Sequence, residues 1–72
     1  MDAKTFIEKH GRDRAEAVAK RAKTNMAYLG QIAGGHRKPS PHLAKRLVAA
    51  SGGELTLVDL RPDIYSDVGQ AA

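Results

Sequence analysis

A break at Lys23–Thr24 constrains the fold most. It separates two short helical patterns whose apolar residues are spaced so that the two helices can pack against each other. Ala19 precedes the break by four residues, and Leu29 and Ile32 follow Ala19 by ten and thirteen positions. Small and apolar side chains at this spacing let one helix cross closely over the next, as in a helix-turn-helix. The residues left on the outer face of the second helix are Asn25, Met26, Ala27, Gly30 and Gln31.

The turn at the break is expected to hold one residue in the left-handed region of the backbone, which Gly or Asn adopts at the lowest cost. Lys23 stands at this position, and we expect it to cost about 1 kcal/mol relative to Gly. The simpler explanation for a lysine at this position is that the packing of the helices tolerates the strain. A contact between Lys23 and a phosphate group is the alternative.

Capping and breaking residues predict the helices before the break. We expect a first helix over residues 2–10, with Asp2 as its cap, Phe6 in the core and Gly11 as the residue that ends it. A second helix is expected over about residues 14–22, because Asp13 and Glu16 have the spacing of a capping box.

Two further helices are predicted after the break. Asn25 is a good N-cap for a helix over residues 26–33, and Ser40 followed by Pro41 marks the start of a helix over residues 41–50. The expected core stripe of that last helix consists of Leu43, Leu47 and Val48.

Residues 54–60 are compatible with a short strand or with a short fifth helix. We prefer the helix, with Thr56 as its N-cap, because a lone strand would have no partner. Pro62 is expected to end it, which gives an all-α, compact four- to five-helix bundle over residues 1–62. Residues 63–72 then form a C-terminal tail, either flexible or docked on a partner, with the apolar residues Ile64, Tyr65 and Val68.

A chain of 72 residues forms one domain near the lower size limit for a stable core. With no cysteine, it has neither a disulfide nor a thiolate metal site. No apolar run approaches the ~20 residues of a membrane span, and the N-terminal residues lack the apolar segment of a secretory signal. We therefore expect a cytoplasmic protein that does not associate with membranes.

Basic residues are concentrated in the middle of the chain. Residues 12–46 hold nine Lys and Arg against two acidic residues, a net charge of +7, whereas residues 47–72 hold one Arg against four acidic residues, a net charge of −3. A basic middle indicates a surface that faces a polyanion. The simpler explanation for the charge alone is a helix face that is exposed to solvent. Predicting a nucleic-acid partner therefore requires the helix pattern as well.

The helix pattern and the charge together predict binding to double-stranded DNA. A helix that lies in the major groove with its N-terminal end toward the bases offers the side chains of its outer face. Gln31 is the best candidate, because its amide can pair with both N6 and N7 of adenine. For Asn25 the role of N-cap is the simpler explanation. The expected base-contacting residues are Met26, Ala27, Gly30, Gln31 and Asn25.

Contacts to the DNA backbone are expected from side chains around that helix. The loop after it places three basic or titratable residues in succession, and Tyr28 either donates to a phosphate or fills the gap between helices. Such contacts set affinity and salt dependence, whereas base contacts set specificity. The expected phosphate-contacting residues are Arg14, Lys23, Tyr28, His36, Arg37 and Lys38. Because few side chains read bases, we expect modest specificity per monomer, raised by a homodimer formed through the C-terminal third.

Catalytic and metal sites find no support in the sequence. His36 and His42 are six residues apart, and neither has a nearby cysteine or a close acidic partner. Gly34-Gly35 lacks the preceding strand of a phosphate-binding loop, so the end of a helix explains it better. We therefore expect no enzyme activity, no cofactor, no metal and no small-molecule ligand.

The chain resembles the Cro/CI-type helix-turn-helix proteins of phages and prophages, and among them the YdaS-like antitoxin/Cro group, in AVAKRAKTNMAYLGQIAGGHRKPSPHLAKRLVAASGG and in LRPDIY. The resemblance covers roughly residues 1–65. It implies a lambda-repressor-like domain, a recognition helix at residues 25–33 and a phosphate-binding loop at residues 36–38. It also implies a transcriptional repressor that binds operator DNA, often as a dimer. Lys23 is the departure, since such proteins usually carry Gly there.

An antitoxin-type interaction module is the alternative function. In that case the acidic C-terminal third and its apolar residues would bind a basic toxin. The two functions are compatible, because antitoxins often repress their own promoters.

Overall fold

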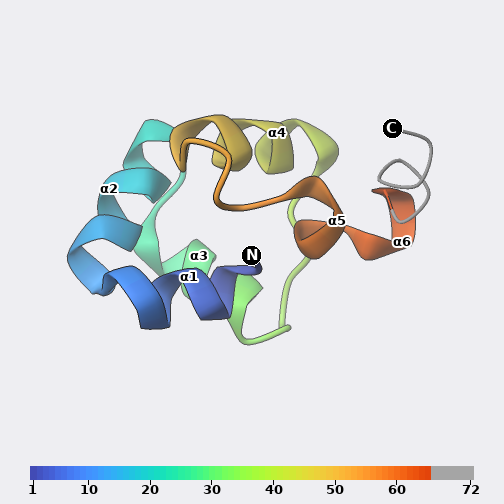
Figure 1. Ribbon diagram of the computed structural model, residues 1–72. Coiled ribbons are helices and arrows are strands. Elements are labelled where there is room, and N and C mark those ends of the chain that lie inside the picture. Colours follow the sequence, from blue (N-terminus) through green and yellow to red (C-terminus); the bar gives the residue numbers. More distant parts are fainter. Residues whose placement is uncertain (66–72) are drawn as a thin grey trace.

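The computed structural model describes residues 1–65, and these residues form six helices and no strand. The all-α prediction is therefore confirmed for the described part of the chain. The Cα radius of gyration is 11.1 Å, close to the ~11 Å expected of a compact chain of this length. The helices are α1 (Ala3–His10), α2 (Arg12–Arg21), α3 (Met26–Ala33), α4 (Pro41–Ala50), α5 (Leu57–Leu60) and α6 (Pro62–Tyr65), as Figure 1 shows.

Short polar side chains begin four of these helices, as predicted. Asp2 accepts a hydrogen bond from the Thr5 amide at 2.7 Å, and Asn25 accepts one from the Tyr28 amide at 2.8 Å. Ser40 and Thr56 do the same for α4 and α5, each at 3.2 Å. The helical prediction for residues 54–60 is thus confirmed, with Thr56 as the cap.

The start of α2 differs from the prediction. The helix begins at Arg12, directly after Gly11, and has no side-chain cap. The expected capping box of Asp13 and Glu16 is therefore wrong, because Asp13 already lies in the first turn. A carboxylate there still interacts favourably with the positive end of the helix dipole.

The chain around Pro62 also differs from the prediction. Pro62 was expected to end the last helix, but it begins α6, since proline fits the first turn of a helix. Arg61 joins α5 to α6 and fixes this segment to the body, because its Nη1 donates to the Pro39 carbonyl at 2.8 Å. Ile64 and Tyr65 of the expected tail therefore belong to α6, and residues 66–72, including Val68, lie outside the described residues.

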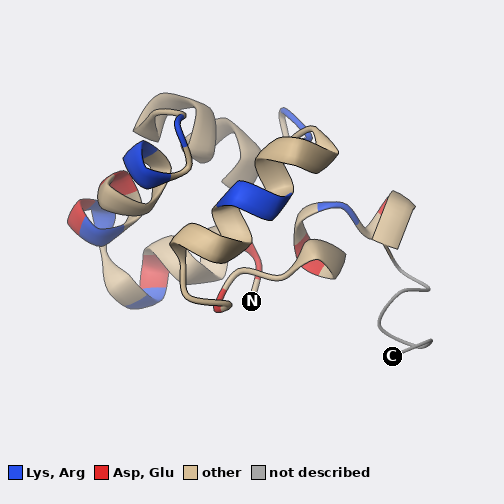
Figure 2. Ribbon diagram, turned by 90° about the horizontal axis from the view of Figure 1, so that it is seen from above, with Lys and Arg blue, Asp and Glu red and all other residues tan. Residues whose placement is uncertain are grey.

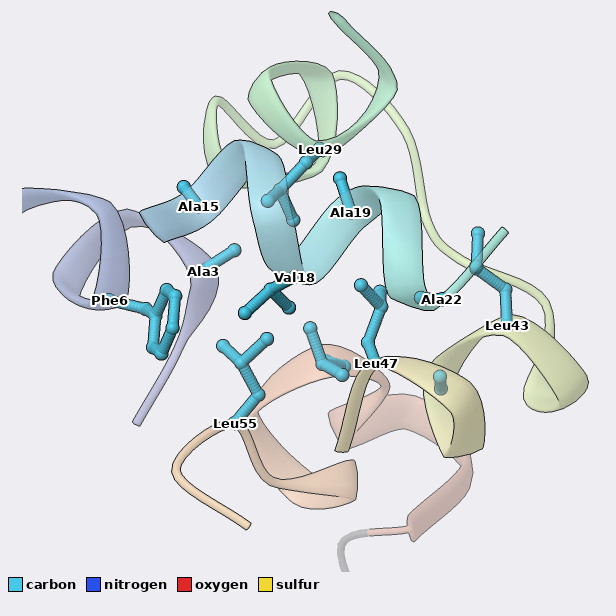
Figure 3. Packing of buried hydrophobic residues seen from close by; sticks show 12 residues of the cluster. Ala3, Phe6, Ala15, Val18, Ala19, Ala22, Leu29, Leu43, Leu47 and Leu55 are labelled. Atoms are coloured by element: carbon cyan, nitrogen blue, oxygen red, sulfur yellow. The ribbon is translucent and has the colours of Figure 1, made fainter. Parts of the chain in front are cut away.

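The hydrophobic core is arranged around α2, which crosses the centre of Figure 3. Ala15 and Ala19 lie on the side of α2 that faces α3 and Leu29, whereas Val18 points to the opposite side, the side of the core that also holds Leu47. All five are buried. The remaining buried core residues are Ala3, Phe6, Ala22, Leu43, Ala44, Leu55 and Leu60.

Two residues predicted for the core, Ile32 and Val48, are only half-buried, and they pack against its edge. The small alanines on α2 bring α3 close, as the spacing around Ala19 predicted. None of the helices in residues 1–65 is long and apolar enough to cross a bilayer.

Candidate nucleic-acid interface

The outer side of α3 lies outside the hydrophobic core. Leu29 is fully buried, whereas Ala27, Gly30 and Gln31 are exposed, and Asn25 is exposed at the start of the helix. Met26 is half-buried at the edge. This separation follows from the helical period, since residues three and four positions apart share a face. The five residues predicted to contact bases therefore lie outside the core, Met26 least completely.

Gly30 has no structural requirement within the chain. A Cβ atom added at this position would meet nothing within 4 Å, and the backbone of Gly30 is in an ordinary helical conformation. Gly in the middle of a helix is less stable than Ala by roughly 0.5–1 kcal/mol. Close approach of another molecule to α3 would explain the glycine, while contacts within this chain do not.

The turn between α2 and α3 contains a strained residue. Lys23 has φ 64°, and it is the one residue other than glycine with positive φ among residues 1–65. The Lys23 amide donates to the Lys20 carbonyl at 3.0 Å, and the Thr24 amide donates to the Ala19 carbonyl at 2.9 Å. These two bonds form a Schellman motif, which needs a left-handed residue at the position of Lys23. The predicted left-handed turn is thus confirmed.

Two other helices end in the same motif with glycine at the equivalent position. Gly35 follows α3 with φ 80°, and Gly52 follows α4 with φ 67°. Their amide hydrogen bonds have the same pattern as those of the Lys23 turn. Lys23 is therefore the exception among these three helix ends, since the other two have glycine at this position. Its side chain is exposed, so packing does not compensate for the strain.

The loop after α3 folds back against the end of that helix. The amides of His36 and Arg37 both donate to the Gln31 carbonyl, at 2.9 and 3.3 Å. The Arg37 guanidinium lies 5.6 Å from the ring centroid of half-buried Tyr28, a cation–π distance. Tyr28 therefore supports Arg37. A Cβ atom on Gly34 would lie 3.0 Å from the His36 ring, so Gly34 leaves room for that imidazole.

Lys38 is exposed in the same loop and lies 3.7 Å from the Asp63 carboxylate. Asp63 is bound more closely by Arg61, whose Nε and Nη2 donate to its two oxygens at 3.0 and 2.9 Å. These hydrogen bonds and the positive charges of Arg61 and Lys38 hold the pKa of Asp63 at about 2. Because Arg61 already occupies the carboxylate, the Lys38 ammonium remains available to a second anion.

Arg14 is in a different environment from the other predicted cations. Its Nη2 donates to Glu54 at 3.0 Å, and its guanidinium lies 5.8 Å from the centroid of the Phe6 ring. His10 binds the other oxygen of Glu54 at 2.8 Å. The hydrogen bonds from His10 and Arg14 lower the pKa of Glu54 below its ordinary value. The structure thus pairs Arg14 within the chain and does not group it with the loop cations.

Lys and Arg lie on α1 and α2, in the turn after α2, in the loop after α3, on α4 and at Arg61, whereas α5 and α6 carry Asp and no Lys or Arg (Figure 2). Arg46, a cation beside the turn that follows α2, had no predicted role. Arg46 of α4 donates from Nε to the Ala22 carbonyl at 2.8 Å, at the end of α2. The 24 positions between the two residues leave no local signal in the sequence that would pair them.

No group of three or more His, Asp or Glu side chains suited to a metal ion occurs within residues 1–65. A comparison of the chain with protein families, with curated proteins and with solved structures found no match.

Proposed function

We propose that α2 and α3 form a helix-turn-helix, and that the protein is a sequence-specific DNA-binding transcriptional regulator of the Cro-like repressor kind. The observation that carries this proposal is the exposed face of α3 with exposed cations at both of its ends: Lys23 before the helix, and Arg37 and Lys38 after it. A repressor of this kind acts in the cytoplasm of a bacterial cell or of a phage-infected host.

The size of α3 supports insertion into the major groove. Eight residues at about 1.5 Å each give a helix about 12 Å long, and the major groove of B-DNA is about 12 Å wide. Cations at the two ends of such a helix can reach the phosphates on either side of the groove. Backbone contacts of this kind fix the orientation of the protein and supply much of its affinity.

Within the groove, Gln31 is the proposed reader of adenine, since its exposed amide both donates and accepts. Ala27 and Met26 supply apolar contact to a thymine methyl group. Gly30 lets the helix backbone approach the base edges. Asn25 uses its side-chain oxygen to cap α3, so it has less to offer a base.

Selection of bound sequences from a random duplex pool tests the proposal, because it finds the operator sequence without assuming one. We expect an enriched site, with two half-sites about one helical turn (~34 Å) apart if the protein binds as a dimer. Affinity for the enriched duplex should fall steeply as salt rises. Recovery of no enriched site, together with no salt-dependent binding, would contradict the proposal.

A second candidate function is protein binding through the C-terminal third, and Ile64 favours it. Ile64 is 45% exposed, the one large apolar side chain so exposed within residues 1–65. A homodimer or an antitoxin–toxin contact would cover it. Sedimentation of the full chain and of an Ile64→Asp variant over a range of concentrations tests the homodimer. A dimer that persists unchanged in the variant would rule out a dimer interface at Ile64.

A further inference from the structure

We infer that Arg46 and Lys23 together form a phosphate-binding site for the DNA backbone at the N-terminal end of α3. This inference rests on the proposed DNA-binding function and adds a residue, Arg46, from a helix outside the α2–α3 pair.

Arg46 is held at the turn by its own hydrogen bond. Its Nε donates at 2.8 Å to the carbonyl of Ala22, which is the C-cap of α2 and directly precedes Lys23. The helix that carries Arg46 is itself fixed, because Leu43, Ala44 and Leu47 of α4 are buried. The guanidinium therefore lies beside the turn before any ligand arrives, which reduces the conformational entropy lost on binding.

The charges of Lys23 and Arg46 are not neutralised by the described residues. Neither has a carboxylate within 4.0 Å in residues 1–65, whereas Arg14, Lys20 and Lys38 each have one. Both side chains are exposed. The two Nη atoms of Arg46 make no hydrogen bond within this part of the chain, so they are free to donate to one phosphate as a pair.

The strain at Lys23 supports the same site. The equivalent positions after α3 and α4 are Gly35 and Gly52, which adopt positive φ at little cost. Lys23 adopts φ 64° while its side chain stays exposed, so what it adds over glycine is a positive charge at the turn. A phosphate bound at the turn would give this charge a partner and so offset the cost of the strain.

The position of the pair also fits a duplex. Lys23 precedes α3 and Arg37 follows it, so these cations lie beyond opposite ends of a helix that is about 12 Å long. This is close to the width of the major groove. The Lys23–Arg46 site would then hold a phosphate of one strand while the loop after α3 holds the other strand.

Binding of the selected duplex over a range of salt concentrations, with wild type and single variants, tests the inference. The variants are Arg46→Gln, Lys23→Gln and a matched control, Lys9→Gln, which removes an exposed charge on α1. Each lost phosphate contact reduces the slope of log affinity against log salt by about 0.9, which corresponds to about eightfold weaker binding at 0.1 M salt. We expect this loss for Arg46→Gln and for Lys23→Gln, and a nearly unchanged slope for Lys9→Gln.

A purely structural role of Arg46, as a cap on α2, would weaken binding without changing the salt slope, and that result would overturn the inference. Arg46→Lys is the rescue variant, because it keeps the charge and should keep the wild-type slope even if it loses the bond to Ala22. Circular dichroism of each variant establishes that it is folded. A wild-type chain that binds no duplex would overturn the proposed function itself, which is a separate outcome.

Discussion

Lys23 and Gly30 are two positions at which the residue present is not the one that local stability prefers. Lys23 occupies a left-handed turn position where the chain elsewhere uses glycine, and Gly30 occupies the middle of a helix where alanine would fit. Lys23 lies just before α3, and Gly30 lies on the exposed face of α3. Residues at binding sites often give up stability in this way, so these two positions offer paired tests of stability and binding.

Replacement of Lys23 by Gly should stabilise the protein. Glycine adopts φ 64° without the clash that a Cβ atom causes, so the free energy of unfolding should rise by about 1 kcal/mol. Urea denaturation measures the change. The control is Lys23→Gln, which removes the charge, keeps the strain and should leave stability nearly unchanged. Equal stability of Lys23→Gly and wild type would mean that the turn is not strained.

Replacement of Gly30 by Ala should raise stability and weaken DNA binding together. The new methyl group has room, so the helix gains roughly 0.5–1 kcal/mol, while the added Cβ atom lies where the duplex would approach. Urea denaturation and duplex titration measure the two effects. Ala27→Gly, on the same exposed face, is the inverse control and should lower stability by a similar amount. Unchanged affinity in Gly30→Ala would show that the DNA does not come close to α3 at this residue.

At the scale of helices, the contact between α2 and α3 determines whether the exposed face of α3 is presented at all. Leu29 enters the space beside Ala15 and Ala19 and is fully buried there (Figure 3). Leu29→Ala should lower the free energy of unfolding by about 2–5 kcal/mol, a large part of the stability of so small a domain. Denaturant midpoints measure this loss. The control Leu29→Met nearly conserves volume and should lose less than about 1.5 kcal/mol. A loss as large in the methionine variant would show that shape, rather than volume, is decisive at this contact.

The existence of most helices was predictable because their signals are local. Asn25 and Ser40 cap helices through atoms only three residues away, and the apolar spacing around Ala19 repeats within a few turns. Contacts between distant residues leave no such signal. The bond from Arg46 to Ala22 spans 24 positions and that from Arg14 to Glu54 spans 40, so no sequence pattern pairs these residues. The sixth helix was missed because proline can end one helix or begin the next.

At the scale of the whole molecule, several polar contacts attach the C-terminal segment to the helices before it, and two groups of them involve charged side chains of both parts. His10 and Arg14 bind Glu54, while Arg61 joins α5 and α6 to the Pro39 carbonyl. The exposed residues of α3 make no hydrogen bond or ion pair with Glu54 or Asp63. The charged contacts of Glu54 and Asp63 therefore contribute to the pH dependence of folding, whereas the exposed cations near α3 account for the salt dependence proposed for DNA binding. Lys38, which lies 3.7 Å from the Asp63 carboxylate, belongs to both sets.

Acid should destabilise the fold through these carboxylates. The folded-state pKa values of Glu54 and Asp63 are lowered, that of Asp63 from 3.8 to about 2. A lowered pKa means that the stabilisation is present above the unfolded-state pKa and is lost as pH falls. The free energy of unfolding should thus be steady above about pH 5 and decrease from there toward pH 2. Urea denaturation across this range measures it, and Glu54→Gln should show a shallower decrease. A free energy of unfolding that rises as pH falls would contradict the assignment of this stabilisation to Glu54 and Asp63.

The most direct test of DNA binding through α3 is a titration of the selected duplex at several salt concentrations, with wild type and with Gln31→Ala. If Lys23, Arg37, Lys38 and Arg46 each neutralise one phosphate, the slope of log affinity against log salt should be about −3.6 per protomer. Gln31→Ala should keep that slope and lose about 1–3 kcal/mol of discrimination against duplexes with a changed adenine. Binding without salt dependence, or discrimination that is the same in both proteins, would contradict DNA binding through α3.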